Sequence, residues 1–404
     1  MNEEEFPCYY FIIRQHLDDS FWISELSSNL ILFGFEDGIS SCNIEKSPFV
    51  KLPSNITKEQ AIAIGRRSVM VRKILEVWGE GSKLDDIYRG FKRCNARPFP
   101  NVSCVGRKSH DFPMDELLEL CKNLEDKKLE KYENKFSVQI FAPSNTSTTE
   151  WYAYACQVIG EGSFDLVNKY TLKERKYLGP TSLSSELALI MANLALAMKG
   201  KYILDPYVGT GGALIGAAHH GAYLLGMEID WRITKDGQPF QTFDQYSLRR
   251  PDIIRSDFSR EGRCLRQTDV CANLFDAIIA DPPYGIRAGA RKTGMLKEGR
   301  EPIPDELRDT HIPQTRKYDG EEVVEDLLNA ASSLLRPCGR LVFLHPVETK
   351  TWEAQGTACL PKHQSLRLLH ACPQRMRMGM SRILVTMEKT NEVVHSELKK
   401  KQKI

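Results

Sequence analysis

The 404-residue sequence lacks the features of several protein classes. Its 11 cysteines stand singly, with no CxxC pair and no Cys/His spacing that suits zinc, which argues against a disulfide framework and a metal site. No charged segment followed by an apolar run opens the chain, so no secretory signal is expected. The longest apolar stretch, residues 187–198, is too short to span a bilayer. These absences indicate a reduced, soluble, cytoplasmic protein.

The sequence also has no excess of charge of one sign, because it contains 55 Lys and Arg and 53 Asp and Glu. A polyanionic partner would therefore have to be met by local basic patches. The lysine cluster at residues 399–401 fits a solvated basic tail over residues 391–404 better than a specific nucleic-acid arm. The length predicts two or three domains.

The N-terminal half, residues 1–170, mixes strand-like and helical segments and contains no catalytic constellation. Thr57 and Gln60 have capping-box spacing, and an apolar stripe at helical period continues from Ile62 to Leu75. A second helix is expected over residues 114–129, and strands over 9–14, 29–35, 136–141 and 151–159. This composition indicates an α+β region that binds a partner or supports the rest of the chain.

The second half, residues 171–390, alternates strands with helices, which predicts a parallel α/β sheet. Strands are expected over residues 202–204, 223–227, 253–254, 275–280, 340–344 and 382–387, and helices over 184–198, 213–220 and 321–335. In such a sheet, ligands bind beyond the carboxyl ends of the strands. Each motif discussed next follows a predicted strand.

The segment DPYVGTGG (205–212) joins a strand to a helix through a glycine-rich turn. It has neither the GxGxxG spacing of a dinucleotide site nor the GK[ST] ending of a phosphate loop. An acidic residue before such a turn suits a cationic ligand without phosphate, and S-adenosylmethionine is one. Asp205 would face its ammonium group, Glu228 its ribose and Asp257 its adenine amino group, because each acid ends a consecutive strand.

The segment DPPYG (281–285) follows the next strand and suits methylation of an exocyclic amine. Such an amine is a poor nucleophile, since its lone pair is conjugated into the ring. The Asp281 carboxylate and the Pro282 carbonyl could accept its N–H groups, with the two prolines stiffening the turn. Tyr284 supplies a flat surface on which a base can stack. Basic residues in the following loop, including Arg291 and Lys292, would contact phosphates.

Together these segments resemble the catalytic subunit of the eukaryotic tRNA guanosine N2-methyltransferases that modify position ten of tRNA. The resemblance also rests on RRSVMVRKILEVWGEG (66–81), GPTSL (179–183), FDQYSL (243–248), RKTG (291–294) and SRILVTMEK (381–389). It implies a ferredoxin-like and THUMP RNA-binding region before a Rossmann-like class I methyltransferase domain, whose sheet closes with an antiparallel strand. It also implies tRNA as substrate and a small zinc-binding activator subunit as partner.

Carried over by position, the resemblance assigns further residues to the cofactor. Thr181 and Ser182 would border its methionine end, and Tyr207, Gly209, Thr210 and Gly211 would form the floor with Asp205. One departure is the short connection between Asp230 and Asp257, where the family has a longer helix.

Two other functions stay open at this stage. A DNA or RNA adenine-N6 or protein glutamine methyltransferase would use the same acceptors, although such enzymes usually carry Asn where this chain has Asp281. A non-catalytic RNA-binding protein with a decayed cofactor pocket is the other alternative, and the intact acids argue against it.

Overall fold

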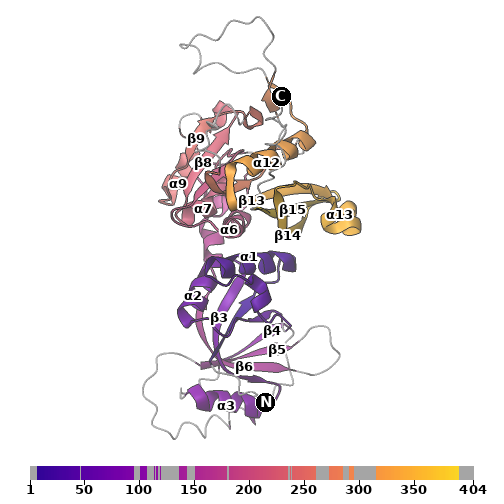
Figure 1. Ribbon diagram of the computed structural model, residues 1–404. Coiled ribbons are helices and arrows are strands. Elements are labelled where there is room, and N and C mark those ends of the chain that lie inside the picture. Colours follow the sequence, from indigo (N-terminus) through magenta and orange to yellow (C-terminus); the bar gives the residue numbers. More distant parts are fainter. Residues whose placement is uncertain are drawn as a thin grey trace, which may run out of the picture. The chain divides into compact units, whose positions relative to one another are not determined.

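The computed structural model describes residues 7–45, 47–94, 101–106, 113, 115–116, 119, 136–142, 151–179, 182–234, 237, 239–260, 273–284, 291–294 and 315–390. The chain forms two compact units, Met1–Asp165 and Leu166–Ile404, which Figure 1 colours along the sequence. No helix among the described residues is long and apolar enough to cross a membrane.

The first unit is built on a six-stranded sheet with the order β2-β1-β3-β6-β5-β4. Neighbouring strands are antiparallel except β4 and β5, which run parallel. The strands are β1 (Cys8–Ile13), β2 (Phe49–Lys51), β3 (Val71–Gly81), β4 (Asn101–Gly106), β5 (Phe136–Ala142) and β6 (Tyr152–Glu161). The helices are α1 (Asp19–Leu32), α2 (Lys58–Arg67), α3 (Leu84–Cys94) and α5 (Phe164–Lys169), which ends in the second unit.

Helix α3 packs directly on the sheet at a crossing of two glycines. A Cβ added to Gly79 in β3 would lie 2.7 Å from the Cα of Gly90 in α3, so both positions must stay without side chains. Ile87 and Phe91 of the helix are buried next to this crossing, against Val138 and Ile140 of β5. Burial of such apolar side chains holds the helix to the sheet.

The expected strand at residues 29–35 is wrong, because residues 29–32 belong to helix α1. The Asp18 carboxylate caps this helix by accepting from the Ser20 backbone N–H at 3.0 Å. Phe21, Trp22, Leu26 and Leu30 are all buried. A short apolar run does not by itself distinguish a strand from a buried helix, and here the helix is buried on most sides.

The helix predicted from Thr57 begins there, with the capping box formed, but it ends at Arg67 instead of running on to Leu75. The cause is a tertiary contact that a sequence pattern does not contain. The buried Glu25 carboxylate accepts the backbone N–H groups of Val69 and Met70, each at 2.9 Å. These bonds take the donors that a continuing helix would use, and β3 starts at Val71. The helix predicted over residues 114–129 lies almost wholly outside the described residues.

The second unit has a seven-stranded sheet with the order β14-β15-β13-β10-β7-β8-β9. The strands from β13 to β9 in this order are parallel, and β15 lies antiparallel between β13 and β14. This confirms the predicted class I methyltransferase sheet with its antiparallel closing strand. The strands are β7 (Tyr202–Asp205), β8 (Tyr223–Glu228), β9 (Asp252–Arg255), β10 (Phe275–Ala280), β13 (Leu335–Glu348), β14 (Leu366–Arg375) and β15 (Met380–Lys389).

Helices cover this sheet, and its central strands β7, β10 and β13 contain continuous buried runs, as parallel strands generally do. Ile278 of β10 and Phe343 of β13 pack with Leu327 of α12. Their buried strand neighbours Ile279 and Val342 lie outside this cluster, because successive side chains of a strand point to opposite faces. Arg340 of β13 ties α6 to the sheet by donating to the Leu194 carbonyl at 2.8 Å. The helices are α6 (Ser185–Leu194), α7 (Ile215–His219), α8 (Trp231–Thr234), α9 (Phe240–Gln245), α12 (Gly320–Leu334) and α13 (Thr349–Gln355).

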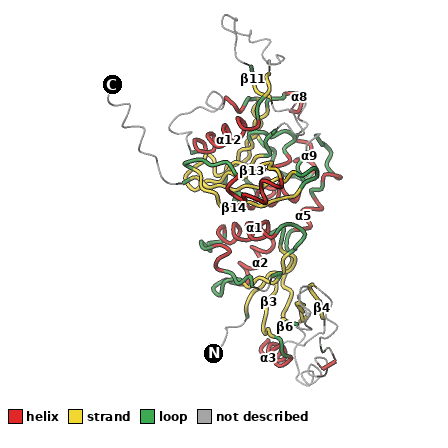
Figure 2. The backbone as a smooth tube through the Cα atoms, turned by 90° about the vertical axis from the view of Figure 1, so that its right-hand side faces the viewer, coloured by secondary structure: helices red, strands yellow, loops and turns green. Residues whose placement is uncertain are grey.

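A separate two-stranded hairpin lies between the methylation motif and α12. Its strands β11 (Arg291–Thr293) and β12 (Thr315–Lys317) pair antiparallel and do not join the large sheet. Figure 2 shows β11 standing apart from the strands of that sheet.

Candidate active site

The glycine turn after β7 has the conformation that its sequence predicts. Gly209 and Gly211 have φ values of +48° and +79°, which side-chain-bearing residues rarely adopt. A Cβ on Gly211 would lie 2.8 Å from the Phe243 ring, so this glycine also makes room for a buried aromatic. Above Gly209 an added Cβ would approach only the Tyr207 carbonyl, at 3.9 Å. The turn is therefore packed beneath Gly211 and open above Gly209, as a floor for a ligand must be.

Three acids surround this turn because β7, β8 and β9 are neighbours in the sheet. Asp205, Glu228 and Asp257 are 1%, 9% and 9% exposed. Asp205 accepts from the Tyr207 backbone N–H at 3.0 Å. Burial raises the pKa of Asp205 to about 8, and Asp281 and Glu228 add to the rise against the Tyr207 hydrogen bond. Ionisation of these neighbouring acids is therefore unfavourable in the empty site, and a bound cation would stabilise their charged forms.

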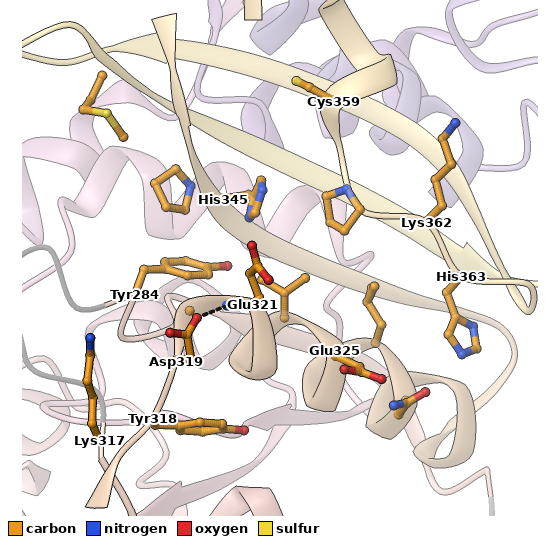
Figure 3. Close-up of a pocket in the computed structure, with 17 residues that line it drawn as sticks. Tyr284, Lys317, Tyr318, Asp319, Glu321, Glu325, His345, Cys359, Lys362 and His363 are labelled. Carbon is orange, nitrogen blue, oxygen red and sulfur yellow. Dashed lines mark hydrogen bonds between the residues drawn. The ribbon is translucent and has the colours of Figure 1, made fainter. Parts of the chain in front are cut away.

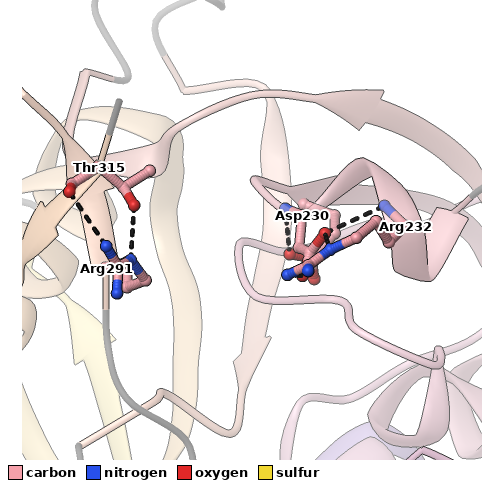
Figure 4. Close-up of polar contacts among 5 residues, drawn as sticks. Asp230, Arg232, Arg291 and Thr315 are labelled. Carbon is pink, nitrogen blue, oxygen red and sulfur yellow. Dashed lines mark hydrogen bonds and ion pairs between the residues drawn. The ribbon is translucent and has the colours of Figure 1, made fainter. Parts of the chain in front are cut away.

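Glu228 connects the end of β8 to the turn. Its two carboxylate oxygens accept from the backbone N–H groups of Gly209 at 3.0 Å and Asp230 at 2.8 Å. Burial raises the pKa of Glu228, although these two hydrogen bonds oppose the rise. The next acid, Asp230, stands before α8 and accepts from the Arg232 backbone N–H at 3.0 Å, as a cap does (Figure 4).

Asp257 holds the hairpin as well as the end of the third strand. One of its oxygens accepts from the Ser259 backbone and hydroxyl at 3.0 and 2.7 Å. The other accepts from the Thr293 backbone and hydroxyl at 2.6 and 2.5 Å. Burial would raise the pKa of Asp257, but these four hydrogen bonds outweigh it and lower the pKa.

The methylation motif enters the same site because β10 pairs with β7. Asp281 directly follows β10 and is close enough to Asp205 to raise its pKa. The Tyr284 ring lies edge-on to His345, with ring centroids 5.7 Å apart. The Tyr284 hydroxyl is buried and has no hydrogen-bond partner in the described structure, and burial raises its pKa well above the ordinary value.

Tyr284 also lines a pocket with a volume of about 960 Å³ (Figure 3). His345 and Pro346 at the end of β13 form one wall, and the first turns of α12 form another. The Nδ1 atom of His345 is buried without a partner among the described residues. Burial lowers the pKa of His345 to about 4, so its ring is neutral and can donate or accept. The pocket offers a large space with unsatisfied polar groups beside the motif.

The remaining predicted residues lie at the same turn or outside the described residues. Ser182 accepts from the Gly179 backbone N–H at 3.1 Å, which fixes the GPTSL segment locally. A Cβ on Gly179 would lie 2.6 Å from the Thr210 methyl group, so this segment lies against the turn. Thr181 is outside the described residues. The structure thus brings together the predicted acids, the turn and the motif.

Sequence reasoning missed Arg175, a buried residue that is 7% exposed. Its Nε donates to the Tyr170 carbonyl at 3.1 Å, and its Nη1 would lie 3.4 Å from a Cβ added to Gly212. Its Nη2 is buried without a partner among the described residues, and burial lowers its pKa to about 10. No sequence signal separates this arginine from its exposed basic neighbours, because its burial depends on the fold.

Comparison with known proteins identifies the family. Two family models match, the Tmrp11 THUMP N-terminal domain over residues 9–117 and the RMKL-like methyltransferase domain over residues 173–251. The tRNA (guanine(10)-N(2))-methyltransferase TRMT11 of Homo sapiens is 32% identical over 94% of this chain and 87% of its own length. The chain belongs to the TRMT11 family. The Dictyostelium discoideum member is 30% identical over 94% of this chain and 82% of its own length.

Among solved structures, TrmN from Thermus thermophilus aligns over 95% of this chain and 99% of that chain. Its sequence identity is 16% and its TM-score is 0.43.

The family resemblance read from the sequence is confirmed, and this member of the TRMT11 family is a methyltransferase whose cofactor is S-adenosylmethionine. The site fits that cationic group. Burial raises the pKa values of Asp205 and Glu228, which a bound cation would lower again, and the space above Gly209 is open. The described residues contain no group of three or more His, Cys, Asp or Glu that could hold a metal ion.

Proposed function

We propose that this chain transfers a methyl group from S-adenosylmethionine to the exocyclic N2 amine of guanosine 10 in tRNA. The observation that carries the proposal is the meeting of two features at one sheet edge. The cofactor-type acids and the DPPY segment share that edge, and relatives named for this reaction match 94% of the chain.

The cofactor would be held by the residues around the glycine turn. Asp205 would face its ammonium group, Glu228 its ribose and Asp257 its adenine, with Tyr207, Gly209, Thr210 and Gly211 beneath. Thr181 and Ser182 would border its methionine end. Arg175 would receive the carboxylate of that end, because its Nη2 is a buried cationic donor without a partner among the described residues. The bound cofactor supplies a methyl group on a positively charged sulfur.

The methylation motif would prepare the amine for attack. The Asp281 carboxylate and the Pro282 carbonyl would accept its two N–H groups, which localises the lone pair on nitrogen. When the N–C bond forms and the S–C bond breaks, the amine loses one proton, and Asp281 is the motif's acceptor for it.

The target base would stack on Tyr284 within the pocket of about 960 Å³. A base must first leave its stack, at a cost of about a few kcal/mol. Stacking on an aromatic ring offsets part of this cost, with about 1–3 kcal/mol per base.

The N-terminal region, residues 1–170, would grip tRNA, since base edges in A-form helices are hidden and RNA is recognised through its shape and backbone. The match of residues 9–117 to the THUMP N-terminal family supports this role. A small zinc-binding activator subunit would bind the catalytic chain, as the family resemblance implies. The complex would act in the cytoplasm.

Deleting the gene and measuring tRNA nucleosides by mass spectrometry tests the proposal. We expect N2-methylguanosine at position 10 to disappear and to return with the wild-type chain. Unchanged N2-methylguanosine at that position would contradict the assignment. Purified chain, labelled cofactor and separate pools of tRNA, DNA and protein would then show which planar amine is methylated instead.

A further inference from the structure

The β11–β12 hairpin places like charges directly opposite each other. Four of its six strand residues are basic. In the antiparallel register Arg291 faces Lys317 and Lys292 faces Arg316. Cross-strand pairs of like charge are destabilising, so each face of the hairpin gains stability from an anion.

The two faces of the hairpin differ in whether a nearby acid neutralises their positive charges. On one face, Lys292 forms an ion pair with Glu322 of α12 at 2.6 Å and lies 4.6 Å from the Tyr318 ring centroid. This face already has an acid.

On the other face, Arg291 donates to the Thr315 hydroxyl at 2.5 Å and to its carbonyl at 3.1 Å, as Figure 4 shows. Both acceptors are uncharged. Within the described part of the chain, Arg291 and Lys317 have no acidic partner. Both side chains are exposed. This face therefore presents two adjacent positive charges that the protein itself does not neutralise.

The same face adjoins the active site on two sides. Lys317 lines the pocket that Tyr284 also lines (Figure 3). Thr293 shares the face of Arg291, because alternate residues of a strand point the same way, and it donates to Asp257. The hairpin is thus anchored at the end of the cofactor strands while its charged face borders the base pocket.

The pocket itself has the opposite charge at one wall. Asp319, Glu321 and Glu325 of the α12 region line it and are exposed. These carboxylates disfavour a phosphate inside the pocket, whereas guanine presents an N2 amino donor to them. Charge therefore separates the two parts of a nucleotide, with the base at the acids and the phosphate at the hairpin.

We propose that the Arg291–Lys317 face binds the phosphodiester backbone next to the nucleotide that enters the pocket. This inference rests on the proposed function for the identity of the RNA. Phosphate oxygens accept from arginine forks and lysine ammonium groups, and such contacts fix the register of a nucleic acid without reading its sequence.

The test compares tRNA binding by the full chain, with its activator present, across salt concentrations. Arg291→Gln and Lys317→Gln should each reduce the slope of log affinity against log salt by about 0.7–0.9, the value of one phosphate contact. Arg316→Gln, on the opposite face of the same hairpin, removes an equal charge and should leave the slope unchanged. Arg291→Lys and Lys317→Arg keep the charge and should keep the slope.

Calorimetric titration with S-adenosylmethionine checks that each variant retains the cofactor pocket and the fold. An equal slope change in Arg316→Gln would overturn the proposal, because binding would then depend only on net charge. No slope change in Arg291→Gln and Lys317→Gln would overturn it too. The readout is binding, so a chain that methylates some other nucleoside would fail the proposed function and still give the slope pattern.

Discussion

Gly211→Ala is the substitution whose effect on the free energy of unfolding follows most directly from the structure. The backbone there has φ +79°, and holding a side-chain-bearing residue in that region costs about 1–2 kcal/mol. The new Cβ would lie 2.8 Å from the Phe243 ring, which is buried, and overpacking of this kind costs about 1–3 kcal/mol. Together we expect about 2–5 kcal/mol less free energy of unfolding for the Leu166–Ile404 unit.

Gly209→Ala is the matched control, since it has φ +48° but meets no neighbour closer than 3.9 Å. It should lose only the backbone part, about 1–2 kcal/mol. Hydrogen exchange of peptides from β7 and β8 under increasing urea measures both variants within the relevant unit. Adding Phe243→Leu to Gly211→Ala should restore part of the loss. Equal losses for the two glycines, or no restoration, would refute the packing argument.

Three further predictions concern the polar groups of the site. Asp205 has a pKa of about 8, so the neutral acid must ionise to bind a cation. As pH increases toward 8, cofactor affinity should therefore increase about tenfold per pH unit. Calorimetry on Asp205→Asn should show no such increase. Arg175→Met should weaken S-adenosylhomocysteine by about 10- to 100-fold and spare 5′-methylthioadenosine, which lacks the carboxylate; equal weakening of both would assign Arg175 a structural role alone. Asp257 has a lowered pKa, so its stabilisation is present above the ordinary carboxyl pKa and is lost as pH falls through the lowered one. Asp257→Asn should therefore speed hydrogen exchange in residues 291–294 at pH 7, and the two proteins should converge as pH falls through the lowered pKa of Asp257.

The parts of the site that could be predicted are those that the chain presents locally. Asp205, Glu228 and Asp281 follow apolar strands in sequence, and parallel strands bring their carboxyl ends to one edge. The glycine turn is likewise encoded within eight residues. These local signals sufficed because each motif carries its own strand, turn and acid.

Other parts depend on contacts between distant residues. The end of α2 is set by Glu25, more than forty residues earlier in the chain. The hairpin pairs Arg291 with Lys317, which are separated by a long stretch of sequence that does not fix their pairing. Asp257 was expected to face adenine. Its hydrogen bonds to Thr293 also anchor the hairpin, and the position of an acid at the end of a strand does not predict this role. The burial of Arg175 also depends on contacts with residues that are distant in the sequence.

The most direct test of the central claim changes one group on the substrate. The assay uses purified chain, with and without the proposed activator subunit, labelled cofactor and two tRNAs, one with guanosine and one with inosine at position 10. Inosine lacks the N2 amine and otherwise keeps the base. We predict methyl transfer to the guanosine tRNA and none to the inosine tRNA. Equal transfer to both would contradict the claim that Asp281 and the Pro282 carbonyl receive that amine.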